Sequence, residues 1–450
     1  MVCLHIALYA PGLWKHPEDQ SHRYKDSAYW IELANILEKG RFDAVFLADV
    51  LGTYDVYQGS RNAAVRQGAQ SPVNDPLLVV PLMSTVTEHL GFGVTASVTH
   101  EHPYTFARRM STLDHITDGR VGWNVVTSYL KSAAVNIGLD DQVKHDERYD
   151  IADEYLKVCY KLWEGSWEDD AVKHDKENGI YTDPTKVHDI QHEGKYFKVP
   201  GAHLCEPSPQ RTPVLFQAGA STRGRAFAAE NGELVFIGSP TKQIAKNTVK
   251  KLRHDAEQIG RDPEEIKVLS MFVPIVGRTE EEAWAKYEDY KQYISYEGAC
   301  ALLGGWTGID FSKYDPDEKL RYVKNDAIQS AVENFTKIDP EKEWTVREII
   351  QSVGIGGMGA FAVGTPEQIA NTMEEWLEEA DVDGFNIAYV VSPGTFIDFV
   401  DLVVPILRER GLVPEKYEGN TLRDNLFGNG DHLPAHHRGK RYSLGSAVGK

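Results

Sequence analysis

The sequence predicts an α/β fold, an eight-stranded parallel (β/α)8 barrel of the TIM type. Apolar runs typical of buried strands alternate with segments of helical periodicity along most of the chain. No G-x-G-x-x-G turn follows an early strand, which disfavours an open doubly wound sheet. The expected strands are residues 1–10, 42–48, 91–98, 121–126, 213–219, 233–237, 266–276 and 384–391.

Helix signals lie between these strands. Asp26 or Ser27 can cap a helix that ends at Lys39. Pro366 stands at the favoured first position of another helix. The helix after Ser221 follows a strand and a turn of small residues, an arrangement that can bind phosphate. Further helices are expected at about residues 76–89, 145–163 and 396–410.

We expect one barrel domain over residues 1–415. Two stretches are too long for simple connections and are predicted to be insertions at the C-terminal face of the barrel, at about 164–209 and 295–360. We expect the first insertion to cover the barrel mouth. The second contains glycine-rich runs and is expected to be a mobile lid. Residues 416–450 are predicted to form a polar tail on the surface.

Composition restricts the class of protein. The formal net charge of -19, from 67 acidic and 48 basic residues, argues against nucleic acid and anionic membranes as partners. No apolar run is long enough to span a bilayer, and no secretory signal is recognisable. Because Cys3, Cys159, Cys205 and Cys300 are far apart in the sequence, we expect free thiols in a reducing compartment, and hence a cytoplasmic protein.

Polar residues at strand ends indicate where a ligand binds. A turn at Asp118 leads into a strand, and Asn124, Thr127 and Ser128 place polar groups in and just after that strand. Asp49 follows the strand at 42–48 in the same way. In a parallel sheet, groups at the carboxyl ends of the strands face the ligand. A buried strand with internally bonded polar residues would show the same pattern.

The stretch 118–128 resembles the signature of flavin-dependent monooxygenases with the bacterial-luciferase barrel fold, in the branch of the nitrilotriacetate and dibenzothiophene-sulfone monooxygenases. The resemblance extends from about Gly12 to about Gly430. It implies that the cofactor is flavin mononucleotide (FMN) in its reduced form, FMNH2. It also implies a separate NAD(P)H:flavin reductase, which agrees with the absence of a nicotinamide fingerprint in this sequence. We further expect a homo-oligomer.

The resemblance also assigns candidate residues to the cofactor. Without it, the simpler structural explanations are favoured: Asp49 caps the next segment, Ser221 is an ordinary N-cap, and His145 is a surface residue in the first turn of a helix. With it, six positions match in register. The implied FMN contacts are Asp49, Thr95, Ser128, His145, Tyr149 and Ser221.

The candidate catalytic residues are Tyr54, Gln70 and Tyr129, which match pocket-lining positions of relatives. Relatives that oxidise long-chain alkanes have His at the position of Tyr129 and another His near Leu302. The run 301–310 looks closer to that of relatives that oxidise dimethyl sulfide, and few basic residues occur in the pocket-lining stretches. We therefore expect oxygenation of a small apolar substrate, a thioether such as dimethyl sulfide. Long-chain alkane oxygenation is the alternative.

A metal-dependent barrel hydrolase is the alternative outside the flavin enzymes. His100 and His102 follow a strand with a spacing that suits zinc, but no further acid or histidine is clearly placed to complete the set. No metal is therefore predicted. A non-catalytic or deazaflavin-using relative is another alternative. Solvent exposure is expected for the tail histidines His432, His436 and His437.

Overall fold

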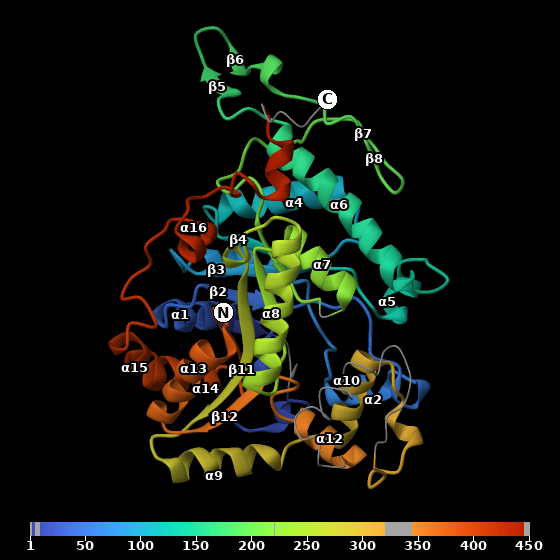
Figure 1. Cartoon of the computed structure of the whole chain (residues 1–450), viewed down its shortest axis with the longest axis vertical. Coiled ribbons are helices and arrows are strands. Elements are labelled where there is room, and N and C mark those ends of the chain that lie inside the picture. The colour runs from blue at the N-terminus through green and yellow to red at the C-terminus, as the bar shows by residue number, and fades with distance from the viewer. Residues whose placement is uncertain (1, 5–9, 220, 320–343, 445–450) are drawn as a thin grey trace.

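The computed structural model describes residues 2–4, 10–219, 221–319 and 344–444. Eight of the strands found in this part of the chain form a barrel in the order β10-β9-β4-β3-β2-β1-β13-β11, and β11 pairs back to β10 (Figure 1). Every pairing in the barrel is parallel. The predicted barrel is confirmed. Of the strand expected over residues 1–10, the described part is Val2–Leu4, which pairs within the barrel, and residues 1 and 5–9 lie outside the described residues. The strands are β1 (Val2–Leu4), β2 (Ala44–Leu47), β3 (Gly91–Ser97), β4 (Val121–Val126), β9 (Val214–Gln217), β10 (Leu234–Ile237), β11 (Lys267–Val276) and β13 (Gly384–Ala388).

A further strand, β12 (Ala360–Gly364), extends the sheet beyond the barrel. It pairs with the second half of β11, from Phe272 to Val276, whereas the first half pairs with β10 and β13. This segment lies at the edge of the expected insertion 295–360, and its sequence does not predict a strand. The long apolar run of β11 leaves an unpaired edge above the barrel, and β12 covers that edge.

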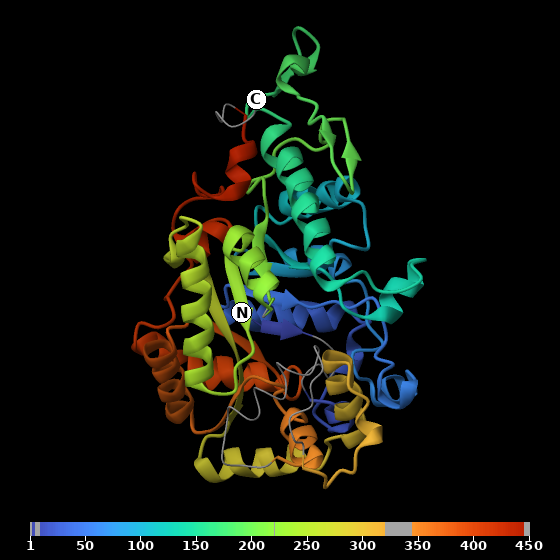
Figure 2. The same ribbon diagram turned by 45° about the vertical axis from the view of Figure 1, so that its right-hand side comes forward.

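Helices cover the outside of the barrel (Figures 1 and 2). In the described part of the chain, no helix is both long and apolar enough to cross a membrane. The α-helices are α1 (Ser27–Lys39), α2 (Asn62–Gln67), α3 (Val80–Ser84), α4 (Pro103–Ile116), α5 (Lys131–Asn136), α6 (His145–Gly165), α7 (Thr222–Asn231), α8 (Lys242–Gln258), α9 (Glu280–Lys291), α10 (Tyr296–Thr307), α12 (Val346–Val353), α13 (Pro366–Ala380), α14 (Gly394–Asp398), α15 (Val404–Glu409) and α16 (Leu422–Phe427).

Prolines account for two departures from the predicted helices. The helix expected over 76–89 is instead a short 3-10 turn that begins at Pro76, followed by α3, in which Pro81 is the second residue. Because proline lacks an N–H and is tolerated only in the first turn of a helix, Pro81 separates the two elements. The last predicted helix, 396–410, is present, but a π-helical turn (Phe399–Val403) lies just before Pro405, which lacks an N–H. The helices predicted from Ser27, His145 and Pro366 are confirmed.

An aromatic layer fills the lower part of the barrel. The rings of Phe46 and Phe216 each pack against Phe236, with centroid distances of 4.5 and 5.7 Å. Gly93 and Gly122 make room for Phe216, since a Cβ atom at either position would lie 2.3 or 2.7 Å from its ring. The barrel is therefore a packed core, and a ligand can enter only above this layer.

The expectation that residues 164–209 cover the barrel mouth is wrong. These residues form two antiparallel hairpins, β5 (Val172–Asp175) with β6 (Ile180–Thr182) and β7 (His192–Glu193) with β8 (Lys198–Val199). The β7–β8 hairpin and the residues after it contact α4 and α6, whereas the β5–β6 hairpin projects beyond these helices (Figures 1 and 2). The Tyr104 hydroxyl donates to the carbonyl of Ala202, and Glu154 accepts the backbone N–H of Phe197 at 2.8 Å. Because α6 runs back along the barrel, the segment begins at the end opposite the mouth.

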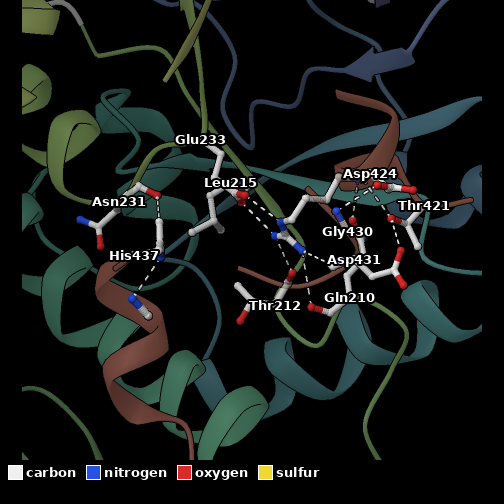
Figure 3. Close-up of polar contacts among 12 residues, drawn as sticks. Gln210, Thr212, Leu215, Asn231, Glu233, Thr421, Asp424, Gly430, Asp431 and His437 are labelled. Atoms are coloured by element: carbon white, nitrogen blue, oxygen red, sulfur yellow. Dashed lines mark hydrogen bonds and ion pairs between the residues drawn. The ribbon is translucent and has the colours of Figure 1, made fainter. Parts of the chain in front are cut away.

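The expectation that residues 416–450 form a surface tail is also wrong for the described part of the tail. Arg423, at the start of α16, is 1% exposed and donates two hydrogen bonds to the Glu233 carboxylate, at 2.7 and 2.9 Å. Its guanidinium also donates to the carbonyls of Thr212 and Asp431 (Figure 3). Because the backbone N–H of Leu422 also bonds to the carbonyl of Gly119, just before β4, the tail closes the N-terminal end of the barrel. His437, predicted to be exposed, is buried and bonds to the carbonyl of Asn231 at 3.1 Å.

Candidate functional site

A cavity of about 620 Å³ lies at the carboxyl ends of the barrel strands, a volume in the range of small-molecule and cofactor sites. Side chains at the ends of β2, β3, β4 and β9 line it, together with the first turn of α6. The structure gathers around this cavity all six residues that the sequence analysis assigned to FMN. They are Asp49, Thr95, Ser128, His145, Tyr149 and Ser221.

One end of the cavity is built to hold an anion. Ser221 is the N-cap of α7, and its hydroxyl oxygen accepts the backbone N–H of Gly224 at 3.0 Å, which leaves the hydroxyl hydrogen available to a ligand. The Tyr149 hydroxyl bonds to the side chains of Ser221 and Thr127. Burial raises the pKa of Tyr149, although these bonds and nearby arginine charges oppose the shift, so the hydroxyl remains a donor at neutral pH.

Two glycines bring the end of β9 close to α7. A Cβ atom at Gly219 would lie 2.9 Å from the Tyr149 hydroxyl oxygen and 3.0 Å from the Cα of Gly224. A Cβ atom at Gly224 would lie 2.7 Å from the same hydroxyl oxygen and 3.1 Å from that of Ser221. Side chains at these positions would therefore fill the space beside the helix N-terminus, where backbone N–H groups can approach a phosphate.

Arg148 is a cationic residue of this end that the sequence analysis missed. It lines the cavity, yet it is 8% exposed, and its Nε atom has no hydrogen-bond partner among the described residues. Burial lowers the pKa of its guanidinium, and no carboxylate in the described part of the chain pairs with it. A buried and unpaired arginine is costly in the absence of a ligand, and at the wall of a cavity such a group is suited to pairing with an anion. The sequence signal that could have identified Arg148 is its position directly before Tyr149, a residue already assigned to the cofactor.

The hydroxyl groups of Thr95, Ser97 and Ser128 form the floor of the cavity, and the side chain of Asn124 lies behind them. The Asn124 amide donates to the Thr95 hydroxyl at 3.0 Å, and the Ser128 hydroxyl donates to that of Ser97 at 2.8 Å. Ser128 has a φ of 55°, a left-handed conformation that is uncommon outside glycine. The buried carbonyl oxygen of the Asn124 side chain has no protein partner in the described structure. Together these groups present donors and acceptors to one edge of a polar ring system.

Asp49 stands beside this floor with a perturbed carboxyl group. Burial raises its pKa to about 6, and the charge of Asp75 adds to the shift, whereas a bond from the backbone of Val50 opposes it. Since the pKa of an unfolded aspartate is lower, near 4, the folded state retains the proton more strongly. The favourable contribution of Asp49 to stability is therefore present below about pH 4 and lost as the pH rises through 6.

We expect Asp49→Asn to raise the melting temperature of the flavin-free protein at pH 7.5 and to leave it unchanged near pH 4. The gain at neutral pH should be about 1–2 kcal/mol, below the full shift because the cavity contains solvent. Thermal unfolding of both proteins from pH 4 to 8 measures the difference. A gain of equal size at both ends of this range would contradict the shifted pKa.

The three candidate catalytic residues form one hydrogen-bonded chain, of which Tyr129 reaches the cavity. The Tyr54 hydroxyl donates to Gln70 at 2.8 Å and lies 2.6 Å from the hydroxyl of Tyr129. Trp306 of α10 donates to the same Tyr54 oxygen at 3.1 Å. Tyr129 is 47% exposed because its ring borders the cavity, whereas burial of its hydroxyl raises the pKa to about 12.

Of the two candidate zinc residues, His102 is engaged in another contact and His100 borders the cavity. His102 is the N-cap of α4 and accepts the backbone N–H of Tyr104, and Glu101 pairs with Arg109. His100 lines the cavity with a buried Nδ1, and burial lowers its pKa. No group of three potential metal ligands was found among the described residues.

Comparison with known proteins places this geometry in a family. A family model described as luciferase-like monooxygenase matches residues 6–384. The dimethyl-sulfide monooxygenase of Hyphomicrobium sulfonivorans is 53% identical over 431 residues, which are 96% of this chain and 89% of the relative. The long-chain alkane monooxygenase of Geobacillus thermodenitrificans is also 53% identical, over 96% of this chain and 94% of the relative.

A solved structure agrees with these two relatives. The crystal structure of a riboflavin lyase with modified FMN and riboflavin superposes with a TM-score of 0.90 at 38% identity, over 98% of both chains. Members of the matched family are flavin-dependent. The chain belongs to the luciferase-like monooxygenase family, whose members are oxidoreductases that incorporate oxygen.

Proposed function

We propose that the protein is a two-component monooxygenase that uses FMNH2 and O2 to oxygenate a small apolar substrate, a thioether such as dimethyl sulfide. The observation that carries the proposal is the unpaired Arg148, which lies with Ser221 and Tyr149 at one end of the cavity. This group of donors fits the phosphate of FMN. A solved relative that binds modified FMN supports the same cofactor.

The remaining cavity residues suit the rest of FMN. His145, whose ring packs against Tyr149 at 5.3 Å, lies where it can bond the ribityl chain or the phosphate. Thr95, Ser128 and Asp49 then face the flavin ring at the strand ends. When bound, reduced FMN supplies the electrons that activate dioxygen. The protein holds the ring, excludes water and orients the substrate.

The reduced cofactor comes, in this proposal, from a separate NAD(P)H:flavin reductase. The name of a relative 38% identical to this chain, component A of nitrilotriacetate monooxygenase, supports a two-component arrangement. We also propose that the protein is a homo-oligomer and that it is cytoplasmic. The free thiols of Cys159, Cys205 and Cys300 agree with a reducing compartment.

The charges of the cavity favour an uncharged substrate. Apart from histidines, the cationic side chains among the described lining residues are Arg109 and Arg148. Arg109 is neutralised by Glu101, and Arg148 is assigned to the phosphate. A polycarboxylate would therefore be buried without a partner charge. An uncharged thioether and an uncharged alkane both suit this cavity wall. Tyr129, at a position where alkane-oxidising relatives have histidine, favours the thioether.

Isotope labelling tests the function. Three reactions each contain the purified protein, FMN, an unrelated flavin reductase, NADH and labelled O2. They differ in the substrate, which is dimethyl sulfide, a long alkane or nitrilotriacetate. We expect one labelled oxygen atom in the product from dimethyl sulfide. Label in the alkane product alone would favour the alternative substrate. Peroxide release with no label in any product would contradict a monooxygenase.

Tyr129→Phe should slow oxygenation and leave FMN binding unchanged. Its hydroxyl borders the substrate side of the cavity and is held by Tyr54, away from the phosphate end. Loss of a group that moves a proton typically lowers kcat by about 100-fold. Single-turnover kinetics and fluorescence titration with FMN separate the two effects. The control is Tyr181→Phe on the β5–β6 hairpin. A weaker FMN affinity with normal kcat would refute this role.

A further inference from the structure

A second, smaller cavity lies beside the main one, behind the carboxyl end of β2. Its volume is about 40 Å³, and α1, the segment 73–76 and Tyr389 form its wall. Val73, Asn74 and Asp75 line both cavities. One short segment therefore separates the small cavity from the proposed flavin site.

The wall of this side chamber is mainly carbon. Leu47, Ala48 and Val79 contribute aliphatic surface. The polar atoms of its two aromatic residues on α1 are engaged elsewhere: the Tyr29 hydroxyl bonds to Ser392 at 2.7 Å, and the Trp30 indole N–H donates to the backbone carbonyl of Tyr24 at 2.8 Å.

The one acid of the chamber wall is also engaged. Asp75 accepts the backbone N–H of Leu77 at 2.9 Å and so caps a helical turn. A chamber with this wall binds water weakly and favours an apolar molecule.

Size limits what the chamber can hold. About 40 Å³ exceeds the roughly 10–15 Å³ that one water molecule requires, but it is far too small for a flavin ring or a long alkyl chain. Molecules of two to four heavy atoms fit. Ala48 lies in the chamber wall and its neighbour Asp49 lines the main cavity, so the two cavities adjoin at this point of the chain.

We propose that this side chamber binds a small uncharged apolar molecule and delivers it to the flavin site. The proposal rests on the proposed function, in which the reaction consumes two such molecules, dioxygen and a small thioether. Both have the size and the lack of charge that the chamber selects. In this proposal Val79, which lies outside the main cavity, contributes to the selection of the substrate.

Two variants of Val79 test the chamber. Val79→Phe fills it, and Val79→Ala enlarges it. With Val79→Phe we expect kcat/KM to fall about tenfold or more for the molecule that uses the chamber, as expected when an apolar pocket loses its space. Oxygen is varied at saturating dimethyl sulfide, and dimethyl sulfide at saturating oxygen. A fall in the first series assigns the chamber to dioxygen, and a fall in the second assigns it to the thioether.

The matched control is Val86→Phe, which adds the same ring at a position 37% exposed and outside both cavities. FMN affinity and melting temperature should be the same for Val79→Phe and this control. If neither kinetic series changes in a folded Val79→Phe protein, the proposal is overturned.

Xenon provides a readout that needs no turnover. Crystals of the protein under xenon pressure should show xenon in the chamber of the wild type and of Val79→Ala, but not of Val79→Phe. Absence of xenon from the wild-type chamber overturns the proposal, whatever the kinetics. If xenon binds but no substrate is oxygenated, the proposed function is wrong, whereas binding of an apolar molecule in the chamber is still supported.

Discussion

Replacing Arg423 by alanine is expected to destabilise the folded protein by about 3–5 kcal/mol, because the Glu233 carboxylate would remain buried without its counter-charge. Both side chains are almost fully buried, at 2% and 3% exposure. The Arg423 charge also lowers the pKa of Glu233 against the effect of burial, so that Glu233 is ionised at neutral pH. Urea denaturation monitored by circular dichroism measures the change.

A surface ion pair provides the control for this prediction. Lys39 and Asp401 are 2.7 Å apart, but their side chains are 69% and 47% exposed. Lys39→Ala should therefore cost less than about 1 kcal/mol. The double variant Arg423→Met, Glu233→Gln should lose less stability than Arg423→Ala, since no buried charge remains. If Arg423→Ala and Lys39→Ala destabilise equally, the tail does not close the barrel as described.

Replacing Arg148 by methionine should have opposite effects on ligand binding and on stability. FMN affinity should fall about 10- to 100-fold, the cost of losing a charge-assisted contact of about 1.5–3 kcal/mol. The melting temperature of the flavin-free protein should rise, because an unpaired buried charge is removed. Fluorescence titration and thermal unfolding measure the two changes.

Riboflavin lacks the phosphate of FMN, so its binding tests whether Arg148 contacts the phosphate. Its affinity should be similar in the wild type and in Arg148→Met. Arg109→Met is the matched control, because Arg109 lines the same cavity but is already paired with Glu101. An equal loss of FMN and riboflavin affinity in Arg148→Met would show that this arginine does not contact the phosphate.

The strand framework was predictable because a buried parallel strand leaves a local signal. Runs such as 42–48 are apolar, short and followed by a polar residue, and Asp49 and Ser128 therefore indicated the ligand end of the barrel. β12 was not predicted, because its pairing depends on how far β11 extends above the barrel, and no local pattern reports that length.

The two arginines were not predicted for one physical reason. In a sequence, a charged residue among other polar residues is expected to be exposed to solvent. Arg148 stands within the charged run that begins α6, and Arg423 within a polar tail, so both resembled solvated residues. Their burial is decided by distant partners: Arg423 meets Glu233, 190 positions away, and Arg148 faces a cavity formed by several strands. The path of residues 164–209 was also unpredictable, because it depends on the direction in which α6 leaves the barrel.

The tail has a consequence for how the chain is made. The backbone N–H of Leu422 bonds to the carbonyl of Gly119, and β1 pairs with β13, so the earliest and latest segments must meet. A ribosome that adds roughly 5–20 residues per second needs about 15–60 s to travel from β4 to Arg423. Glu233 has no counter-charge while the last 190 residues of that stretch are made, and the edge of β1 stays open until β13 is made. The barrel of the nascent chain therefore remains open until β13 is made and lacks its tail contact until Arg423 is made, so its yield should depend on protection by chaperones during synthesis.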